Sequence, residues 1–126
     1  MKFSHKYIIV GAGSAGCVLA NKLSENPKNS VLLIEAGPMD SSYSIKMPLA
    51  ASSLFKSKKY GWGYETEPEK NLNNRTINWP RGKTLGGSSS INGMLYIRGQ
   101  ADDYDHWEQL GNYGWGYRDL LKYFIA

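Results

Sequence analysis

The chemistry that this sequence can support is concentrated in residues 81–93, RGKTLGGSSSING. Gly86 and Gly87 lack a Cβ, so the chain there can adopt conformations that other residues resist, and a ligand can touch the main chain. The serines at 88–90 are predicted to cap a helix whose free N–H groups point at that ligand. The segment is therefore predicted to be a loop at which a ligand comes close to the backbone.

A second glycine element, GAGSAG, occupies residues 11–16. Its spacing is G-x-G-x-x-G, in which each glycine has a separate task. Gly11 is predicted to make a tight turn, Gly13 to let a pyrophosphate approach, and Gly16 to let a helix and a strand pack closely. The element predicts dinucleotide binding, with an incidental glycine-rich turn as the alternative.

Two short apolar runs flank this element, at residues 7–10 (YIIV) and 31–34 (VLLI). Both are typical of buried parallel strands. The second strand delivers Glu35 about 20 residues beyond the glycines, where a carboxylate accepts hydrogen bonds from ribose hydroxyls. A ribose 2′-phosphate would be repelled by Glu35, so NADP is disfavoured and FAD or NAD remains.

Between the strands, helical spacing predicts a helix that Asn26 and Pro27 end. The apolar residues expected on its inner face are Ala15, Val18, Leu19 and Leu23. Further along, a short helix is predicted around residues 48–55, and strands near 61–68 and 76–79 are predicted to pair as a hairpin. The other expected elements are a helix at 102–110, with Trp107 and Leu110 facing inward, and a final helix at 117–124.

The two glycine elements belong to a wider set of motifs that resembles the amino-terminal part of the glucose-methanol-choline (GMC) flavin oxidoreductases. Within that family, the sequence is similar to choline dehydrogenase and related alcohol dehydrogenases. The resemblance covers nearly the whole chain. The motifs that carry it are residues 11–16, LIEAGP at 33–38, WGYETEP at 62–68, GK at 82–83, LGGSS at 85–89, IN at 91–92, Tyr96, Gly99 and DYDHW at 103–107.

This resemblance implies an α/β fold: a Rossmann-like FAD-binding βαβ unit with added short strands and helices. Residues 1–126 are then the amino-terminal part of a GMC-type FAD-binding domain, incomplete relative to a larger two-domain fold and lacking its substrate domain. The implied cofactor is FAD, and the implied reaction is oxidation of the CH–OH group of a small primary alcohol such as choline. The residues assigned to FAD are Gly11, Ala12, Gly13, Ser14, Ala15, Gly16, Glu35, Ala36, Thr84, Gly86, Gly87, Ser88, Asn92, Gly93, Met94 and Leu95.

Ile91 departs from part of this family. In its choline oxidases, the residue before the flavin-contacting Asn is a His bonded covalently to the flavin, whereas an aliphatic side chain cannot form that bond. FAD is therefore expected to be non-covalent. The family's catalytic His lies near the carboxy terminus, and neither His5 nor His106 matches it. No catalytic residue is assigned, and the chain alone is expected to be inactive.

The composition, 41% hydrophobic and 21% charged, is typical of a globular domain. Although the net charge is +4, the basic residues are scattered, and residues 56–59 are interpreted as a solvated loop rather than a nucleic-acid site. The single cysteine, Cys17, allows no internal disulfide and suits a reducing compartment. No metal site, transmembrane segment or signal peptide is expected.

These observations indicate a cytoplasmic protein, with membrane association of a longer form left open. Two alternatives to the FAD-dependent alcohol dehydrogenase also stay open. The first is an inactive truncated fragment that binds a dinucleotide without turnover. The second is an NAD-dependent dehydrogenase, or another FAD family that shares only the first glycine element.

Overall fold

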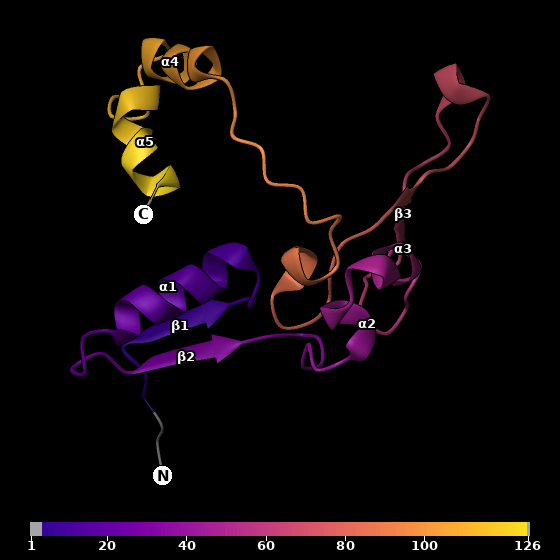
Figure 1. Cartoon of the computed structure of the whole chain (residues 1–126), viewed down its shortest axis with the longest axis horizontal. Helices are drawn as coiled ribbons and strands as arrows, with labels where there is room; N and C mark the ends of the chain where they lie inside the picture. Colours follow the sequence, from indigo (N-terminus) through magenta and orange to yellow (C-terminus); the bar gives the residue numbers. More distant parts are fainter. Residues whose placement is uncertain (1–3, 126) are drawn as a thin grey trace. The chain divides into compact units, whose positions relative to one another are not determined.

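The computed structural model describes residues 4–125, which divide after Met94 into two compact units. The fold is mixed α/β, as predicted (Figure 1). The first unit contains β1 (Tyr7–Val10), α1 (Ser14–Ser24), β2 (Val31–Ile34), α2 (Tyr43–Lys46), η1 (Pro48–Ala50), α3 (Ala51–Leu54), β3 (Tyr64–Glu65), η2 (Lys70–Leu72), β4 (Asn78–Trp79) and η3 (Gly87–Ser90). The second contains α4 (Ala101–Gln109) and α5 (Tyr117–Phe124).

The predicted βαβ unit is present. β1 and β2 pair in parallel, from Tyr7 opposite Val31 to Val10 opposite Ile34. Figure 1 shows α1, which connects them, lying along the two strands. The helix ends at Ser24, shortly before Pro27, because proline cannot continue a helix. Both strands therefore end at the same edge, where the first glycine element begins.

The inner face of α1 differs from the prediction. Ala15 is exposed, and Val18 and Leu19 are 60% and 51% exposed. The helix instead packs on the strands through Gly16, which is buried against the side chain of Ile9. The half-buried residues that follow this face are Ala20 and Leu23. The spacing of hydrophobic residues does not predict this face, because the residue of α1 that lies closest to the strands is Gly16, which has no side chain.

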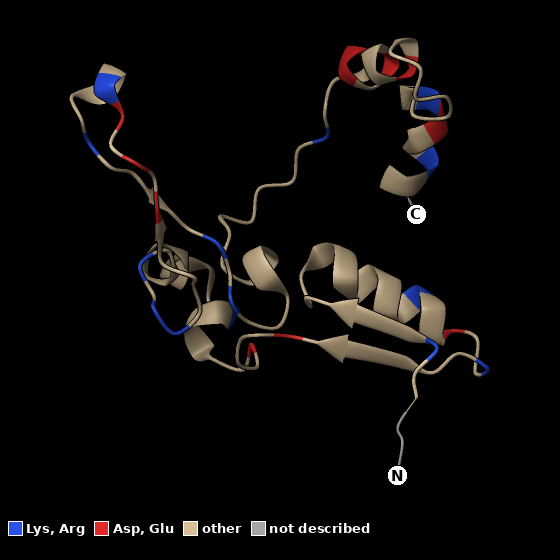
Figure 2. Ribbon diagram, turned by 180° about the vertical axis from the view of Figure 1, so that it is seen from behind, with Lys and Arg blue, Asp and Glu red and all other residues tan. Residues whose placement is uncertain are grey.

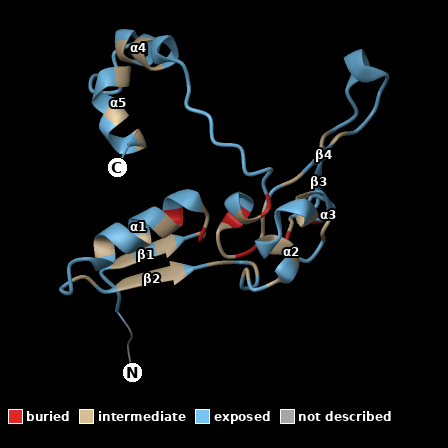
Figure 3. Ribbon diagram, viewed as in Figure 1, coloured by how far each residue is buried: buried red, intermediate tan, exposed pale blue. Residues whose placement is uncertain are grey.

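The two-stranded sheet leaves much of its apolar surface open. Ile8 is 60% exposed and Val10 82% exposed, because a sheet of two strands covers few of its own side chains. Figure 3 shows that the buried positions gather instead near the start of α1, around η3 and next to α3. The buried apolar cluster of the first unit consists of Leu54, Tyr60 and Ile91.

The segment between β2 and η3 folds as an excursion. β3 and β4 pair antiparallel, with Tyr64 opposite Trp79, which confirms the predicted hairpin with shorter strands than expected. The helix predicted around residues 48–55 is present as η1 followed by α3, whereas α2 has no counterpart in the predictions. Both hairpin strands are exposed. Neither strand has a buried face that would stabilise a longer pairing, and both stay short.

In the second unit, α4 and α5 contact each other through aromatic rings. Tyr104 lies 5.5 Å from Phe124 and 6.0 Å from Tyr117, between ring centroids. The predicted inward face of α4 is wrong for Leu110, which is 68% exposed, while Trp107 is 43% exposed and packs edge-on against Tyr104. Tyr104 is the residue of α4 that faces α5, because its ring lies near both Tyr117 and Phe124, at the two ends of that helix.

Within residues 4–125, the charged side chains do not form a basic stripe. Figure 2 shows lysines and arginines spread over several segments, whereas acidic residues gather on α4. Among residues 4–125, no helix is both long and apolar enough to span a bilayer. The same residues contain no group of three metal-ligating side chains.

Candidate functional site

The first glycine element has the geometry that its spacing predicts. Gly11 has a φ of +95°, which favours glycine, and it turns the chain out of β1. A Cβ at Gly16 would overlap the carbonyl oxygen of Gly11. A Cβ at Gly13 would meet nothing within 4 Å. The first and third glycines therefore serve the fold, and the second leaves open space for a ligand.

The N-terminus of α1 faces this open space with unpaired donors. Gly13 is the N-cap and makes no side-chain cap, and the first intrahelical bond runs from the Cys17 N–H to the Gly13 carbonyl. The N–H groups of the preceding turn therefore have no intrahelical acceptor. No acidic residue lies in that turn. Such a helix end favours an anionic group such as a pyrophosphate.

The second glycine element forms a 3₁₀ turn, and its serines do not cap a helix as predicted. Ser89 and Ser90 donate their hydroxyls back to carbonyls of Gly86 and Leu85, at 2.6 and 2.7 Å. Ser88 Oγ accepts the Gly82 N–H at 3.0 Å. Because the turn is only four residues long, the hydroxyls bond to their own loop and hold its shape.

The two glycine elements touch each other, although the residues in contact, Gly13 and Gly87, lie 74 positions apart in the sequence. Gly87 has a φ of +57°, and a Cβ there would lie 2.9 Å from the Cα of Gly13. Beside this contact, the Gly86 N–H donates to the Ala12 carbonyl at 2.7 Å. Only glycine at 87 allows this approach, since a side chain would meet backbone and adopt a strained φ.

Glu35 lies at the end of β2, as predicted, and holds both neighbouring loops. Its Oε2 accepts the Ala12 N–H at 2.8 Å, and its Oε1 accepts the Gly37 N–H at 2.9 Å. Each carboxylate oxygen can accept a further hydrogen bond. The half-buried carboxylate can therefore fix the loops and still bind a ribose hydroxyl.

Thr84, one of the residues assigned to FAD by the resemblance, is buried. It is the fully buried polar residue of the described chain, with 0% exposure. Its hydroxyl donates to the Pro38 carbonyl at 2.8 Å, and the adjacent Leu85 N–H donates to the same oxygen at 3.0 Å. Its side chain therefore lies in the packing between two segments and does not face open space.

A cleft of about 470 Å³ opens where these segments meet, and we call it the glycine cleft. Six predicted residues line it: Gly11, Gly13, Glu35, Ala36, Gly87 and Ser88. The lining residues that sequence analysis missed are Val10, Ile34, Trp62 and Gly82. Of these four, Gly82 belongs to the predicted ligand loop, residues 81–93.

Trp62 brings an aromatic wall to the glycine cleft. Trp62 is 43% exposed, and the Lys83 Nζ lies 4.7 Å from its ring centroid. Arg81 likewise lies over a tryptophan of the hairpin, 5.5 Å from the centroid of Trp79. These two cations are therefore engaged with aromatic rings. No spacing rule could have placed Trp62 here, because it comes from the hairpin excursion.

The remaining predicted residues lie outside the glycine cleft. Asn92 is exposed, and its Oδ1 accepts the Met94 N–H at 2.9 Å. Met94 has a φ of +58°, a strained value for a residue with a side chain. Asn92 and Met94 both line a separate cavity of about 280 Å³ beside α2 and α3. Leu95 belongs to the second unit and is 84% exposed.

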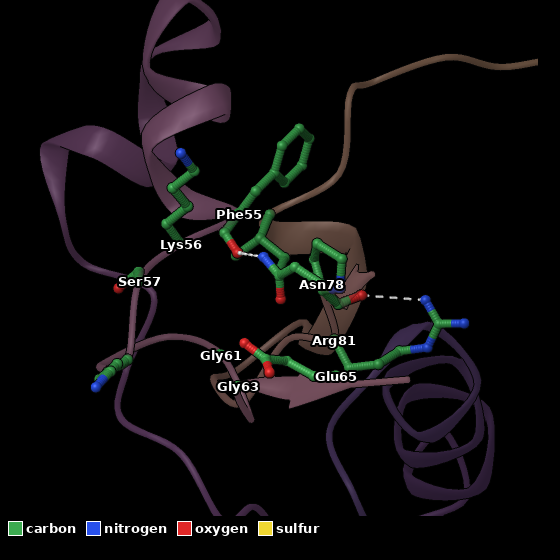
Figure 4. A pocket seen from close by; sticks show the side chains of 11 residues that line it. Phe55, Lys56, Ser57, Gly61, Gly63, Glu65, Asn78 and Arg81 are labelled. Carbon is green, nitrogen blue, oxygen red and sulfur yellow. Dashed lines mark hydrogen bonds between the residues drawn. The ribbon is translucent and has the colours of Figure 1, made fainter. Parts of the chain in front are cut away.

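A further pocket, of about 340 Å³, lies between the end of α3 and the base of the hairpin. Figure 4 shows that two of its cations do not converge: the side chains of Lys56 and Arg81 point in different directions. Asn78 donates to the Phe55 carbonyl at 3.3 Å. Lys56 and Arg81 therefore do not form a paired anion site in this pocket.

Neither histidine of the described chain supplies a catalytic acid or base to the glycine cleft. His5 and His106 are both exposed, and neither lines the cleft. The geometry of the cleft suits a phosphate-bearing ligand and a ribose. Neither His5 nor His106 is placed to transfer a proton there.

Comparisons with known proteins agree with this geometry. The model of the GMC oxidoreductase family matches residues 5–126. The chain is 58% identical over 118 residues to an oxygen-dependent choline dehydrogenase of Rhizobium etli (strain CIAT 652), covering 94% of this chain and 22% of that protein. It resembles the crystal structure of pyridoxine 4-oxidase from Mesorbium loti, with a TM-score of 0.90 at 40% identity, over 96% of this chain and 24% of that one. It also resembles an FAD-dependent oxidoreductase from Chaetomium thermophilum, with a TM-score of 0.82 at 40% identity, over 97% and 20%.

The chain therefore belongs to the GMC oxidoreductase family. It spans about a fifth of the length of the relatives that it matches, 22% in the case of the Rhizobium etli protein. The part that it spans includes both glycine elements and Glu35, which together form the glycine cleft.

Proposed function

We propose that residues 1–126 are the FAD-binding part of a flavin-dependent oxidoreductase that acts on a primary alcohol. The observation that carries this proposal is the contact between the two glycine elements, with Gly87 against Gly13 and Glu35 beside them. The N-terminus of α1 would hold the pyrophosphate, and Glu35 the adenosine ribose. When bound, FAD supplies the acceptor for a hydride from the alcohol carbon.

FAD is favoured over NAD by membership of the GMC oxidoreductase family. A fingerprint at residues 11–16 alone suits either dinucleotide. Family membership and the FAD-dependent relative from Chaetomium thermophilum support FAD. Titration of the folded 126-residue chain with FAD and with NAD tests this choice: we expect saturable FAD binding at one site, displaced by ADP. Binding of NAD in preference to FAD would favour the NAD-dependent alternative.

The alcohol substrate is proposed from the relatives, with choline as the named example. Because no described histidine lines the cleft, we expect no turnover by this chain alone. A chimera that joins it to the remaining part of the Rhizobium etli choline dehydrogenase tests the whole proposal. Choline oxidation by the chimera and none by the chain supports it; turnover by the chain alone would contradict the predicted lack of activity. We also propose a cytoplasmic location, supported by the single cysteine.

The flavin is expected to be dissociable. Ile91 is aliphatic, is 3% exposed and packs with Leu54 and Tyr60, so it offers no nucleophile to the flavin. Acid precipitation of the FAD complex should leave the yellow colour in the supernatant. Colour that stays with the protein pellet would contradict non-covalent binding. As a control, the same precipitation after addition of free FAD to an unrelated folded protein should also leave the flavin in solution.

A further inference from the structure

Thr84 stands out because its polar side chain is fully buried next to a ligand cleft that it does not line. Its hydroxyl donates to the Pro38 carbonyl at 2.8 Å. Its own carbonyl accepts the Gly87 N–H at 2.7 Å. Thr84 thus bonds on one side to the segment after β2 and on the other to a glycine that faces the cleft.

These bonds belong to a closed ring that joins three segments, and we call it the three-segment ring. The Gly37 N–H donates to Glu35, Glu35 also accepts the Ala12 N–H, and the Ala12 carbonyl accepts the Gly86 N–H. Thr84 and its neighbour Leu85 close the ring through the Pro38 carbonyl. Hydrogen bonds therefore connect the two glycine elements and Glu35, which line the glycine cleft, to one another.

The packing at this ring allows little adjustment. A Cβ at Gly37 would overlap the backbone of Lys83 and Thr84, and a Cβ at Gly82 would overlap the backbone of Gly87 and Ser88. Segments in such close contact cannot compensate for a lost hydrogen bond by a small shift. The loss instead favours conformations in which residues 84–88 leave their place beside Gly13.

We propose that Thr84 is a positioning residue for FAD: its hydroxyl holds residues 84–88 in the conformation that binds the cofactor, and Thr84 makes no contact with FAD itself. This inference rests on the proposed function. If the binding-competent conformation becomes a minor one, the apparent dissociation constant rises in proportion. The loss of one buried hydrogen bond therefore predicts about tenfold weaker FAD binding.

The test compares FAD titrations of the 126-residue chain and its variants. Thr84→Val keeps the shape and removes the donor, so its dissociation constant should rise about tenfold. Thr84→Ser keeps the donor and should stay within about twofold of the wild type. Thr84→Cys, with a weaker donor, should fall between them. Ser53→Ala removes a hydroxyl of α3 that donates to the Ala50 carbonyl at 2.7 Å, outside the ring, and should leave the affinity unchanged.

The absorbance spectrum of the bound flavin separates positioning from contact. At saturating FAD, Thr84→Val should give the wild-type spectrum, because only the fraction of competent protein has changed. An altered spectrum at saturation would overturn the inference in favour of direct contact. A smaller dissociation constant for Val than for Ser, or equal constants for all three variants, would also overturn it. Failure of the wild-type chain to bind FAD would overturn the proposed function and this inference together, whereas normal binding by Thr84→Val overturns the inference alone.

Discussion

Gly16→Ala is expected to lower the free energy of unfolding by about 3 kcal/mol, the upper part of the range for overpacked positions. The added methyl would overlap the carbonyl oxygen of Gly11, and it would come within 3.4 Å of the Ile9 side chain. The overlapping atom is backbone at a turn with a φ of +95°, so it cannot move aside as a flexible side chain would. Urea denaturation followed by circular dichroism measures the effect.

Gly13→Ala is the matched control for this prediction. It adds the same methyl three residues earlier, where nothing lies within 4 Å, so the unfolding midpoint should stay close to the wild-type value. FAD binding should nevertheless weaken in both variants, in Gly16→Ala through the fold and in Gly13→Ala through the blocked approach of the pyrophosphate. A wild-type unfolding midpoint in Gly16→Ala would contradict the packing described for α1.

Glu35→Gln is expected to weaken FAD binding by about 30-fold, which corresponds to about 2 kcal/mol for a charge-assisted hydrogen bond. The carboxylate accepts N–H groups from Ala12 and Gly37 at 2.8 and 2.9 Å. In glutamine, one of these oxygens is replaced by a donor, which would face a backbone N–H. The substitution thus removes an acceptor for the ribose and disturbs a loop at the same time. Isothermal titration with FAD measures the loss.

Glu67→Gln provides the control for charge alone, because Glu67 is exposed and lies outside the glycine cleft. It makes the same change of net charge, so a general electrostatic effect would appear in both variants. We expect wild-type affinity in Glu67→Gln. Equal losses in the two variants would indicate that Glu35 does not act through its local hydrogen bonds.

The sequence predicted those features that local spacing determines. Strand, glycine turn, helix and second strand follow one another within 35 residues, and Glu35 comes directly after the second strand. Gly11 and Gly16 act as their spacing predicts, because their tasks depend on near neighbours. The predicted approach of a pyrophosphate to Gly13 stays a prediction. The hairpin at β3 and β4 was also predicted, from alternation and an intervening turn.

Features that depend on distant partners were not predicted. The inner face of α1 is built around Gly16, which carries no hydrophobic signal. The hydrogen bond from Thr84 to Pro38 spans 46 residues, and Trp62 reaches the cleft from the hairpin. The serines after Gly87 gave a capping pattern, yet their turn is too short to become a helix. In each case the tertiary contact decided the role of the side chain.

The central claim is that two distant glycine elements form one FAD site, and hydrogen exchange of the backbone amides tests it most directly. With FAD present, exchange should slow both in residues 11–16 and in residues 86–88, because ligand binding suppresses local opening of the loops that it contacts. Exchange in η2, at the tip of the hairpin, should stay unchanged. Protection of only one glycine element, or of neither at saturating FAD, would contradict the account.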